Sequence, residues 1–203
     1  GGMTNNPYIL DILSQPDALK TALDQFDPVP LAPLAKAIRN NDFDRILITG
    51  MGGSLYASYP VWLMLAETGL PVLWVDTAEL IHHTPALITP KTLLWMVSQS
   101  GKSAEIVSAI DLKPGSLLAT VNDLESPLAK AGQYHVPICA GTEHTVSTRT
   151  YVNTLAVGQL AALVLLGRDV EPARAELMQT ASAMKSYLAD WESRVQEIGK
   201  VVG

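Results

Sequence analysis

Short apolar runs alternate along most of the chain with segments whose apolar residues follow helical spacing. The run from Leu93 to Val97 is bounded by polar residues on both sides, which is typical of a strand buried on both faces of a parallel sheet. Similar runs recur before and after it, and the alternation of strand and helix predicts an α/β domain with a doubly wound parallel sheet and helices on both faces. We expect five strands, over residues 45–49, 72–75, 93–97, 117–122 and 135–139.

Helical patterns extend the chain on both sides of this core. Residues 7–26 predict an amphipathic arm that is interrupted near Pro16, and two further helices are expected after Pro172. The helix expected over 150–166 is apolar nearly all round, which places it either in the core or at a subunit interface. We divide the chain into an N-terminal helical arm over 3–40, a central domain over 41–170 and C-terminal helices over 171–203.

Composition and charge narrow the class of partner. The 203 residues are 48% apolar and 17% charged, which is a globular composition, and the net charge is −6. This charge argues against nucleic acid or an anionic membrane surface as a partner. The single Cys139 excludes an internal disulfide framework, and there is no apolar run of about 18 residues that would predict a membrane span. We expect a cytoplasmic protein.

The strand at 93–97 ends at a cluster of hydroxyl side chains. Ser98, Ser100 and Ser103 lie within six residues, and Gly101 lets the backbone approach a ligand closely. We expect Ser100 to cap the following helix, whose free N–H groups and dipole would favour an anion. The alternative is that these residues only cap a helix. The pattern predicts a phosphate cradle.

The same residues carry a resemblance to a known family. Ser98-Gln99-Ser100-Gly101-x-Ser103 is similar to the S-Q-S-G-x-[ST] signature of sugar isomerase (SIS) domains, which have a flavodoxin- or Rossmann-like fold and bind phosphosugars. The likeness is to the first SIS half of glucosamine-6-phosphate synthase and related isomerases and deaminases. It implies that Ser98, Gln99, Ser100 and Ser103 hold the sugar phosphate. Lys102 stands where the synthase usually has Glu, and it could pair with the phosphate or point into solvent.

Two interpretations compete for the turn after the first strand. Gly50-x-Gly52 opens a dinucleotide fingerprint, and Asp76 follows the second strand where a ribose-binding acid is expected, but Leu55 stands where the third glycine would be. In terms of the family, Gly53 and Ser54 resemble part of the Gly-Thr-Ser turn that contacts the substrate. We favour phosphosugar binding at Gly53 and Ser54.

A second segment, residues 141–151, is similar to the Gly-Pro-Glu-x-x-Val-Ala-Ser-Thr-Lys-x-Phe segment of the synthase family, with one residue missing between Val146 and Ser147. The resemblance implies that Val146 lines the sugar pocket through its backbone and that Ser147 and Thr148 contact the substrate. Arg149 replaces the family's Lys. Glu143 is the candidate catalytic residue, either as a base or as a member of a hydrogen-bonded network.

The resemblance implies an aldose/ketose phosphosugar isomerase or an amino-sugar or fructosamine phosphate deaminase, acting without a cofactor and as a homodimer. The catalytic Glu and His of two-SIS relatives lie largely in a second half that this sequence lacks, so we expect a neighbouring subunit or a further domain to supply them. A non-catalytic phosphosugar sensor is the alternative, although no basic DNA-binding segment is present. His82 and His83 are adjacent and point in different directions, so no metal site is expected.

Overall fold

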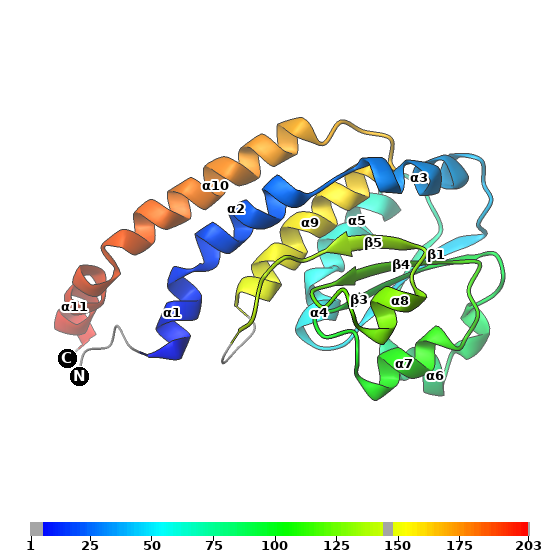
Figure 1. Ribbon diagram of the computed structural model, residues 1–203, viewed down its shortest axis with the longest axis horizontal. Coiled ribbons are helices and arrows are strands. Elements are labelled where there is room, and N and C mark those ends of the chain that lie inside the picture. The colour runs from blue at the N-terminus through cyan, green and yellow to red at the C-terminus, as the bar shows by residue number, and fades with distance from the viewer. Residues whose placement is uncertain (1–5, 144–147, 203) are drawn as a thin grey trace.

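A parallel five-stranded sheet forms the centre of the computed structural model, which describes residues 6–143 and 148–202 (Figure 1). The strands lie in the order β2-β1-β3-β4-β5, and every neighbouring pair is parallel. The predicted α/β fold class and the five strands are confirmed. The strands are β1 Arg45–Gly50, β2 Val72–Asp76, β3 Thr92–Ser98, β4 Ser116–Val121 and β5 Tyr134–Pro137.

Helices precede the sheet, connect its strands and follow it. The described α-helices are α1 Pro7–Leu13, α2 Gln15–Gln25, α3 Ala32–Arg39, α4 Gly53–Ala57, α5 Tyr59–Ala66, α6 Thr77–His82, α7 Ala104–Ile110, α8 Pro127–Ala131, α9 Arg149–Leu165, α10 Glu171–Ala189 and α11 Trp191–Val202. Two short 3-10 helices, η2 Val29–Leu31 and η3 Pro85–Leu87, complete the description.

Strand β3 shows how the sheet divides two apolar cores. All of its residues are buried, and successive side chains point to opposite faces, so Trp95 and Val97 join one core while Leu94 and Met96 join the other. The first core also contains side chains from α2, α3, α5, α9 and α10. The second is closed by α6, α7 and α8, which lie below the sheet in Figure 1. Burial on both faces explains why the strand is a continuous apolar run.

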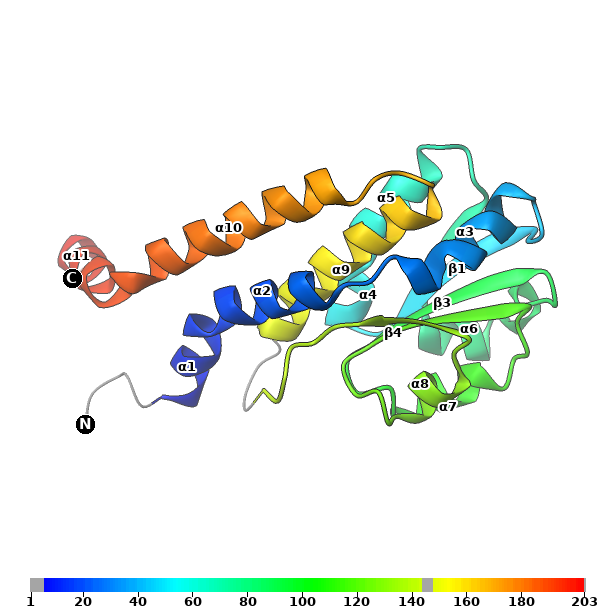
Figure 2. The ribbon, with the colours of Figure 1, turned by 45° about the horizontal axis from the view of Figure 1, so that its top comes forward.

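The N-terminal arm is part of the first core. Leu19 and Leu23 of α2 are 2% and 0% exposed, and α10 runs beside α2 (Figure 2). The Arg174 guanidinium on α10 donates hydrogen bonds to the carbonyl oxygens of Leu23 and Phe26. The arm is therefore fixed to the body by apolar packing and by the hydrogen bonds of the half-buried Arg174 guanidinium.

Helix α9 crosses the first core. Val157, Leu160 and Ala161 are 0% exposed, so its apolar circumference serves the core of this chain, one of the two roles that the sequence left open. Within residues 6–143 and 148–202, no helix combines the length and the apolar character needed to cross a membrane.

The helical segment that follows β1 is broken at Ser58. Helix α4 ends at Ala57 and α5 begins at Tyr59. Pro60 has no N–H to donate to the preceding turn, so it fits only in the first turn of a new helix. The Ser58 hydroxyl satisfies the Leu55 carbonyl oxygen at 2.6 Å.

The chain changes direction across the sheet between β1 and β3. These strands are neighbours and end together, with Gly50 paired to Val97, while β2 lies on the outer side of β1. A Cβ atom at Gly50 would lie 2.8 Å from the Val97 carbonyl oxygen, so only glycine fits this close approach. In open α/β sheets ligands bind outside the carboxyl ends of the strands at such a switch point. The strand order is flavodoxin-like and differs from that of the dinucleotide fold.

Candidate functional site

The loop after β3 presents two serine hydroxyl groups at the switch point. Ser98 Oγ accepts a hydrogen bond from the Gly101 N–H at 3.0 Å, and Ser100 Oγ accepts one from the Lys102 N–H at 3.3 Å. Each oxygen is therefore used as an acceptor by the loop itself. In the described part of the chain neither hydroxyl proton has an acceptor, so both remain available to donate to an anion.

The helix after this loop begins later than predicted. Its N-cap is Ser103, whose Oγ accepts the Ile106 N–H at 3.4 Å, and the first helical residue is Ala104. The prediction that Ser100 is the N-cap is wrong because Gly101 adopts a φ of +62°, a left-handed conformation that a right-handed helix cannot contain. The consequence is a wider loop, in which Ser100 is released from capping.

Gly101 fixes the loop against α8. Its carbonyl oxygen accepts the Leu128 N–H at 3.2 Å. A Cβ atom at this position would lie 2.3 Å from Ser126 Oγ, well inside van der Waals contact, and the positive φ would be strained for any other residue. Glycine is thus required here by both space and backbone conformation.

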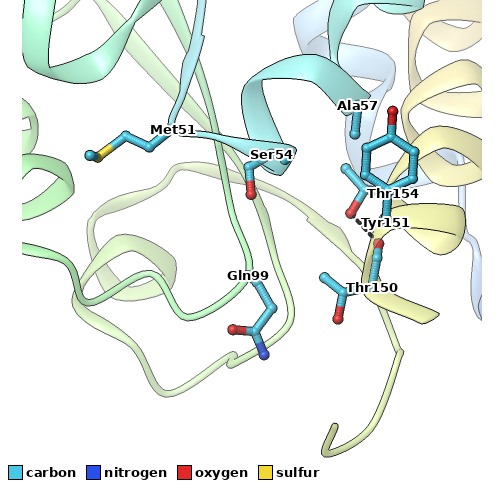
Figure 3. Close-up of a pocket in the computed structure, with 8 residues that line it drawn as sticks. Met51, Ser54, Ala57, Gln99, Thr150, Tyr151 and Thr154 are labelled. Carbon is cyan, nitrogen blue, oxygen red and sulfur yellow. Dashed lines mark hydrogen bonds between the residues drawn. The ribbon is translucent and has the colours of Figure 1, made fainter. Parts of the chain in front are cut away.

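A cavity of about 220 Å³ opens between the loops after β1 and β3 and the first turns of α9. We call it the smaller cavity. Figure 3 shows Ser54 and Gln99 on one side of it and Thr150, Tyr151 and Thr154 of α9 on the other. The Thr154 hydroxyl donates to the Thr150 carbonyl oxygen at 2.6 Å. The remaining lining residues are Met51, Gly53 and Ala57.

A second cavity, of about 620 Å³, lies on the other side of Gln99, and we call it the larger cavity. Gln99 lines both cavities. Asn122, which follows β4, anchors the wall: its Nδ2 donates to the Gly141 carbonyl oxygen and its Oδ1 accepts the Ala140 N–H, both at 2.8 Å. The other lining residues come from α2 and from the loops after β4 and β5; they are Thr21, Gln25, Asp123, Leu124, Cys139, Thr142 and Glu143.

Glu143 caps the first turn of α9. Its Oε1 accepts the Arg149 N–H at 2.6 Å and the Thr148 hydroxyl at 3.2 Å, and its Oε2 accepts the Thr150 N–H at 3.3 Å and the Thr150 hydroxyl at 2.5 Å. The side chain is 7% exposed. Because a helix N-terminus attracts an anion, this carboxylate already fills the anion position at the start of α9.

Two ionisable groups near the larger cavity have shifted pKa values. The hydrogen bond from the Lys102 ammonium to Asp123, followed by that from the Glu125 N–H, holds the pKa of the Asp123 carboxyl below its usual value. Lys102 is therefore paired with Asp123 and does not simply point into solvent. Burial raises the pKa of the Cys139 thiol, which keeps this group protonated. In the described residues, His, Cys, Asp and Glu form no group of three that could hold a metal.

The structure brings most of the predicted site residues to one edge of the sheet. Gly53, Ser54 and Gln99 line the smaller cavity, and Ser103 Oγ lies 4.0 Å from the sulfur of Met51, another lining residue. Thr148 is occupied by Glu143. The predicted contacts of Val146 and Ser147 lie outside the described residues.

Sequence reasoning missed the contribution of α9 to the site. Thr150, Tyr151 and Thr154 belong to a segment whose composition indicates a buried helix. Thr150 and Thr154 are four residues apart and share a face, and two polar residues at this spacing in an apolar helix were the available signal.

Residues 41–164 match the SIS domain family, and the chain belongs to this family. The match spans the sheet, the serine loop and all but the last residue of α9, so it includes both walls of the smaller cavity.

Curated relatives and a solved structure agree with the assignment. The chain is 28% identical over 195 residues to a glutamine–fructose-6-phosphate aminotransferase of Methanocaldococcus jannaschii, covering 93% of this chain and 17% of that protein. It is 33% identical over 129 residues to an arabinose 5-phosphate isomerase of Pseudomonas aeruginosa, covering 60% of this chain and 40% of that protein. A structure from Silicibacter pomeroyi, provisionally assigned as a phosphosugar isomerase, superposes with a TM-score of 0.69 at 27% identity, covering 89% of this chain and 56% of that one. The chain thus spans less than half the length of both curated relatives.

Proposed function

We propose that this chain binds a phosphorylated sugar at the switch point and belongs to an aldose/ketose phosphosugar isomerase or an amino-sugar phosphate deaminase. The observation that carries the proposal is the serine loop, whose Ser98 and Ser100 hydroxyls keep their protons for an anion. The phosphate would lie against this loop. The names of the curated relatives, an arabinose 5-phosphate isomerase and a fructose-6-phosphate aminotransferase, support the same class of ligand.

The smaller cavity supplies groups suited to a sugar. Ser54 and Gln99 offer hydroxyl and amide groups that can donate to and accept from sugar hydroxyls, and the Thr150 hydroxyl, whose proton is donated to Glu143, can accept from them. The larger cavity adds the polar side chains of Asn122 and Thr142 on the other side of Gln99. With a net charge of −6, the chain has no general attraction for phosphate, so affinity must come from these local donors.

Isomerisation needs a base that moves a proton between the C1 and C2 carbons of the sugar. The residues described as lining the smaller cavity include no carboxylate or imidazole, and both oxygens of Glu143 are already used in capping α9. We therefore propose that Glu143 acts through positioning and that the base comes from a neighbouring subunit or from a further domain.

A homodimer is part of the proposal. Leu155 of α9, Met64 of α5 and Met184 of α10 line an apolar groove of about 410 Å³. An apolar surface of this kind suits contact with a second subunit.

We also place the chain in a reducing compartment, the cytoplasm, because its single cysteine, Cys139, has a free thiol.

The experiment that tests the proposal combines binding with turnover. Calorimetry should show that fructose 6-phosphate or arabinose 5-phosphate binds more tightly than inorganic phosphate. Turnover should then depend on protein concentration, because a subunit that completes the site is lost on dilution. Failure of every sugar phosphate to bind more tightly than inorganic phosphate would refute the proposed function. Binding without turnover, in a preparation shown to be dimeric, would exclude a neighbouring copy of this chain as the source of the base, and a further domain or the phosphosugar sensor would then be the explanation.

A further inference from the structure

Helix α9 presents one buried and one half-buried polar side chain to the N-terminal arm. Arg149 and Asn153 are four residues apart and therefore lie on one face of the helix. The Arg149 side chain is 15% exposed and the Asn153 residue is 0% exposed. Buried polar groups of this size need partners, and here the partners lie on the arm and on the loop after β5.

Arg149 connects α1 to the start of α9. Its Nη2 lies 3.5 Å from Asp11 Oδ1, and Asp11 is 3% exposed. The same nitrogen donates to the Thr142 carbonyl oxygen, and Nε lies 4.0 Å from Glu143 Oε1. One guanidinium thus contacts the arm, the loop before α9 and the carboxylate that caps α9.

Asn153 makes the corresponding contact one turn later. Its Nδ2 donates to the carbonyl oxygens of Ala18 on α2, at 3.1 Å, and of Ile138 after β5, at 3.0 Å. We call this set of residues the arm contact: Asp11, Ala18, Arg149 and Asn153. It ties two successive turns of α9 to α1 and α2.

The neighbouring face of the same two turns lines the smaller cavity. Thr150 follows Arg149 and Thr154 follows Asn153, so each cavity residue is about 100° around the helix from a residue of the arm contact. A rotation of α9 would move Thr150 and Thr154 relative to Gln99 and Ser54. The serine loop belongs to β3 and α7 and would stay in place.

We propose that the arm contact sets the rotation of α9 and that Arg149 is a positioning residue for the sugar part of the ligand. This inference rests on the proposed function. It predicts separate control of the two halves of the ligand: the serine loop determines affinity for phosphate, and the arm contact determines the additional affinity for the sugar.

The test compares fructose 6-phosphate and inorganic phosphate by calorimetry on the full chain. Arg149→Met should weaken fructose 6-phosphate binding about tenfold, as for the loss of one hydrogen bond, and leave phosphate binding unchanged. Asp11→Asn, a nearly isosteric change outside both cavities, should also weaken fructose 6-phosphate binding. This second variant allows the test to be made if Arg149→Met does not fold. Equal weakening of both ligands, or no change for fructose 6-phosphate, would overturn the inference.

Arg174→Met is the matched control. Arg174 also ties the arm to the body, through Leu23 and Phe26, but it does not contact the start of α9. It should lower the melting temperature and leave the ratio of the two affinities unchanged.

Hydrogen exchange separates failure of this inference from failure of the proposed function. The amides of residues 152–154 should exchange faster in Arg149→Met or Asp11→Asn than in Arg174→Met, whether or not a sugar binds. If the unmodified chain binds no sugar phosphate, the proposed function fails and this comparison alone decides on the positioning role. Equal exchange in all three variants would then overturn it.

Discussion

In Ser98 and Ser100 the hydroxyl oxygen and the hydroxyl proton have different roles. Each oxygen accepts a backbone N–H of the loop, which fixes its position, and each proton is left for a ligand. A hydroxyl that is already held in place loses little further side-chain entropy when an anion binds. At the scale of single residues, this division of roles would allow an acidic chain to bind the phosphate group of the proposed ligand.

Ser100→Ala removes one of these donors without altering the core. It should reduce phosphosugar binding by about 1–3 kcal/mol, the range for a hydrogen bond to a charged group. Calorimetry with fructose 6-phosphate measures the loss. Ser108→Ala, at an exposed position of α7, is the control and should bind as the unmodified chain does. Equal affinities for Ser100→Ala and the control would mean that the Ser100 hydroxyl does not contact the ligand.

Glu143→Gln replaces an acceptor oxygen of the α9 cap with an NH₂ group. The new NH₂ group then faces other donors, either the Thr148 hydroxyl and the Arg149 N–H or the donor groups of Thr150. The negative charge at the helix N-terminus is also lost. We expect a loss of about 1–3 kcal/mol in the free energy of unfolding, together with weaker sugar binding. Urea denaturation and calorimetry measure the two effects. A variant with unchanged stability and affinity that has lost only turnover would identify Glu143 as the base instead.

The hydrogen bond from Lys102 is the largest of the influences that lower the pKa of the Asp123 carboxyl. In Lys102→Met the pKa of Asp123 should rise toward its usual value, because the hydrogen bond that lowers it is absent. A lowered pKa in the folded state stabilises the protein above the usual pKa of Asp, and this contribution is lost as the pH falls through the folded value. Carboxyl-detected NMR follows the titration. An identical Asp123 titration in the variant would show that Lys102 is not its partner in solution.

At the scale of elements, the loop after β3 separates two features of unequal predictability. The strand before it could be predicted from the sequence, but the start of the helix after it could not. The five apolar residues from Leu93 to Val97 indicate a strand because local sequence is sufficient for a run that is buried on both faces. The prediction of Ser100 as the N-cap failed because Gly101 adopts a positive φ, at a position where Ser126, the N-cap of α8, leaves no room for a side chain. A cap residue chosen by type alone cannot include this tertiary contact.

The two walls of the smaller cavity were predicted unequally for the same reason. Ser54 and Gln99 follow strands, and the carboxyl ends of parallel strands meet at one edge, so their place could be predicted. Thr150 and Thr154 lie on a helix that is apolar nearly all round, and its pattern does not say which face meets the cavity. Packing of the arm against α9 decides that, through residues distant in the sequence.

Gly101→Ala tests the loop as an element. The added Cβ would meet Ser126 Oγ and the residue would be held at a positive φ, so we expect a loss of about 1–3 kcal/mol in unfolding free energy and a loss of phosphate affinity. Gly199→Ala is the matched control, because no atom lies within 4 Å of its added Cβ and the site is within helix α11. The control should be as stable as the unmodified chain or slightly more stable. Equal stability of Gly101→Ala would contradict the described loop conformation.

At the scale of the whole molecule, the helices on the two faces of the sheet support different parts of the candidate site. Helices α6, α7 and α8 close the second core, and α7 and α8 support the serine loop from that face. The first core carries α9, the N-terminal arm and α10, and so the α9 wall of the smaller cavity (Figure 2). A ligand at the switch point would therefore contact groups supported by both cores.

The most direct test of the central claim is a thermal-shift titration of the unmodified chain. The ligands are fructose 6-phosphate, arabinose 5-phosphate and glucosamine 6-phosphate, with inorganic phosphate and the free sugars as controls. A ligand that binds only the folded state raises the melting temperature. We predict that at least one sugar phosphate raises it more than inorganic phosphate and the matching free sugar do at equal concentration. Shifts no larger than that of inorganic phosphate for all three sugar phosphates would contradict the account of the site.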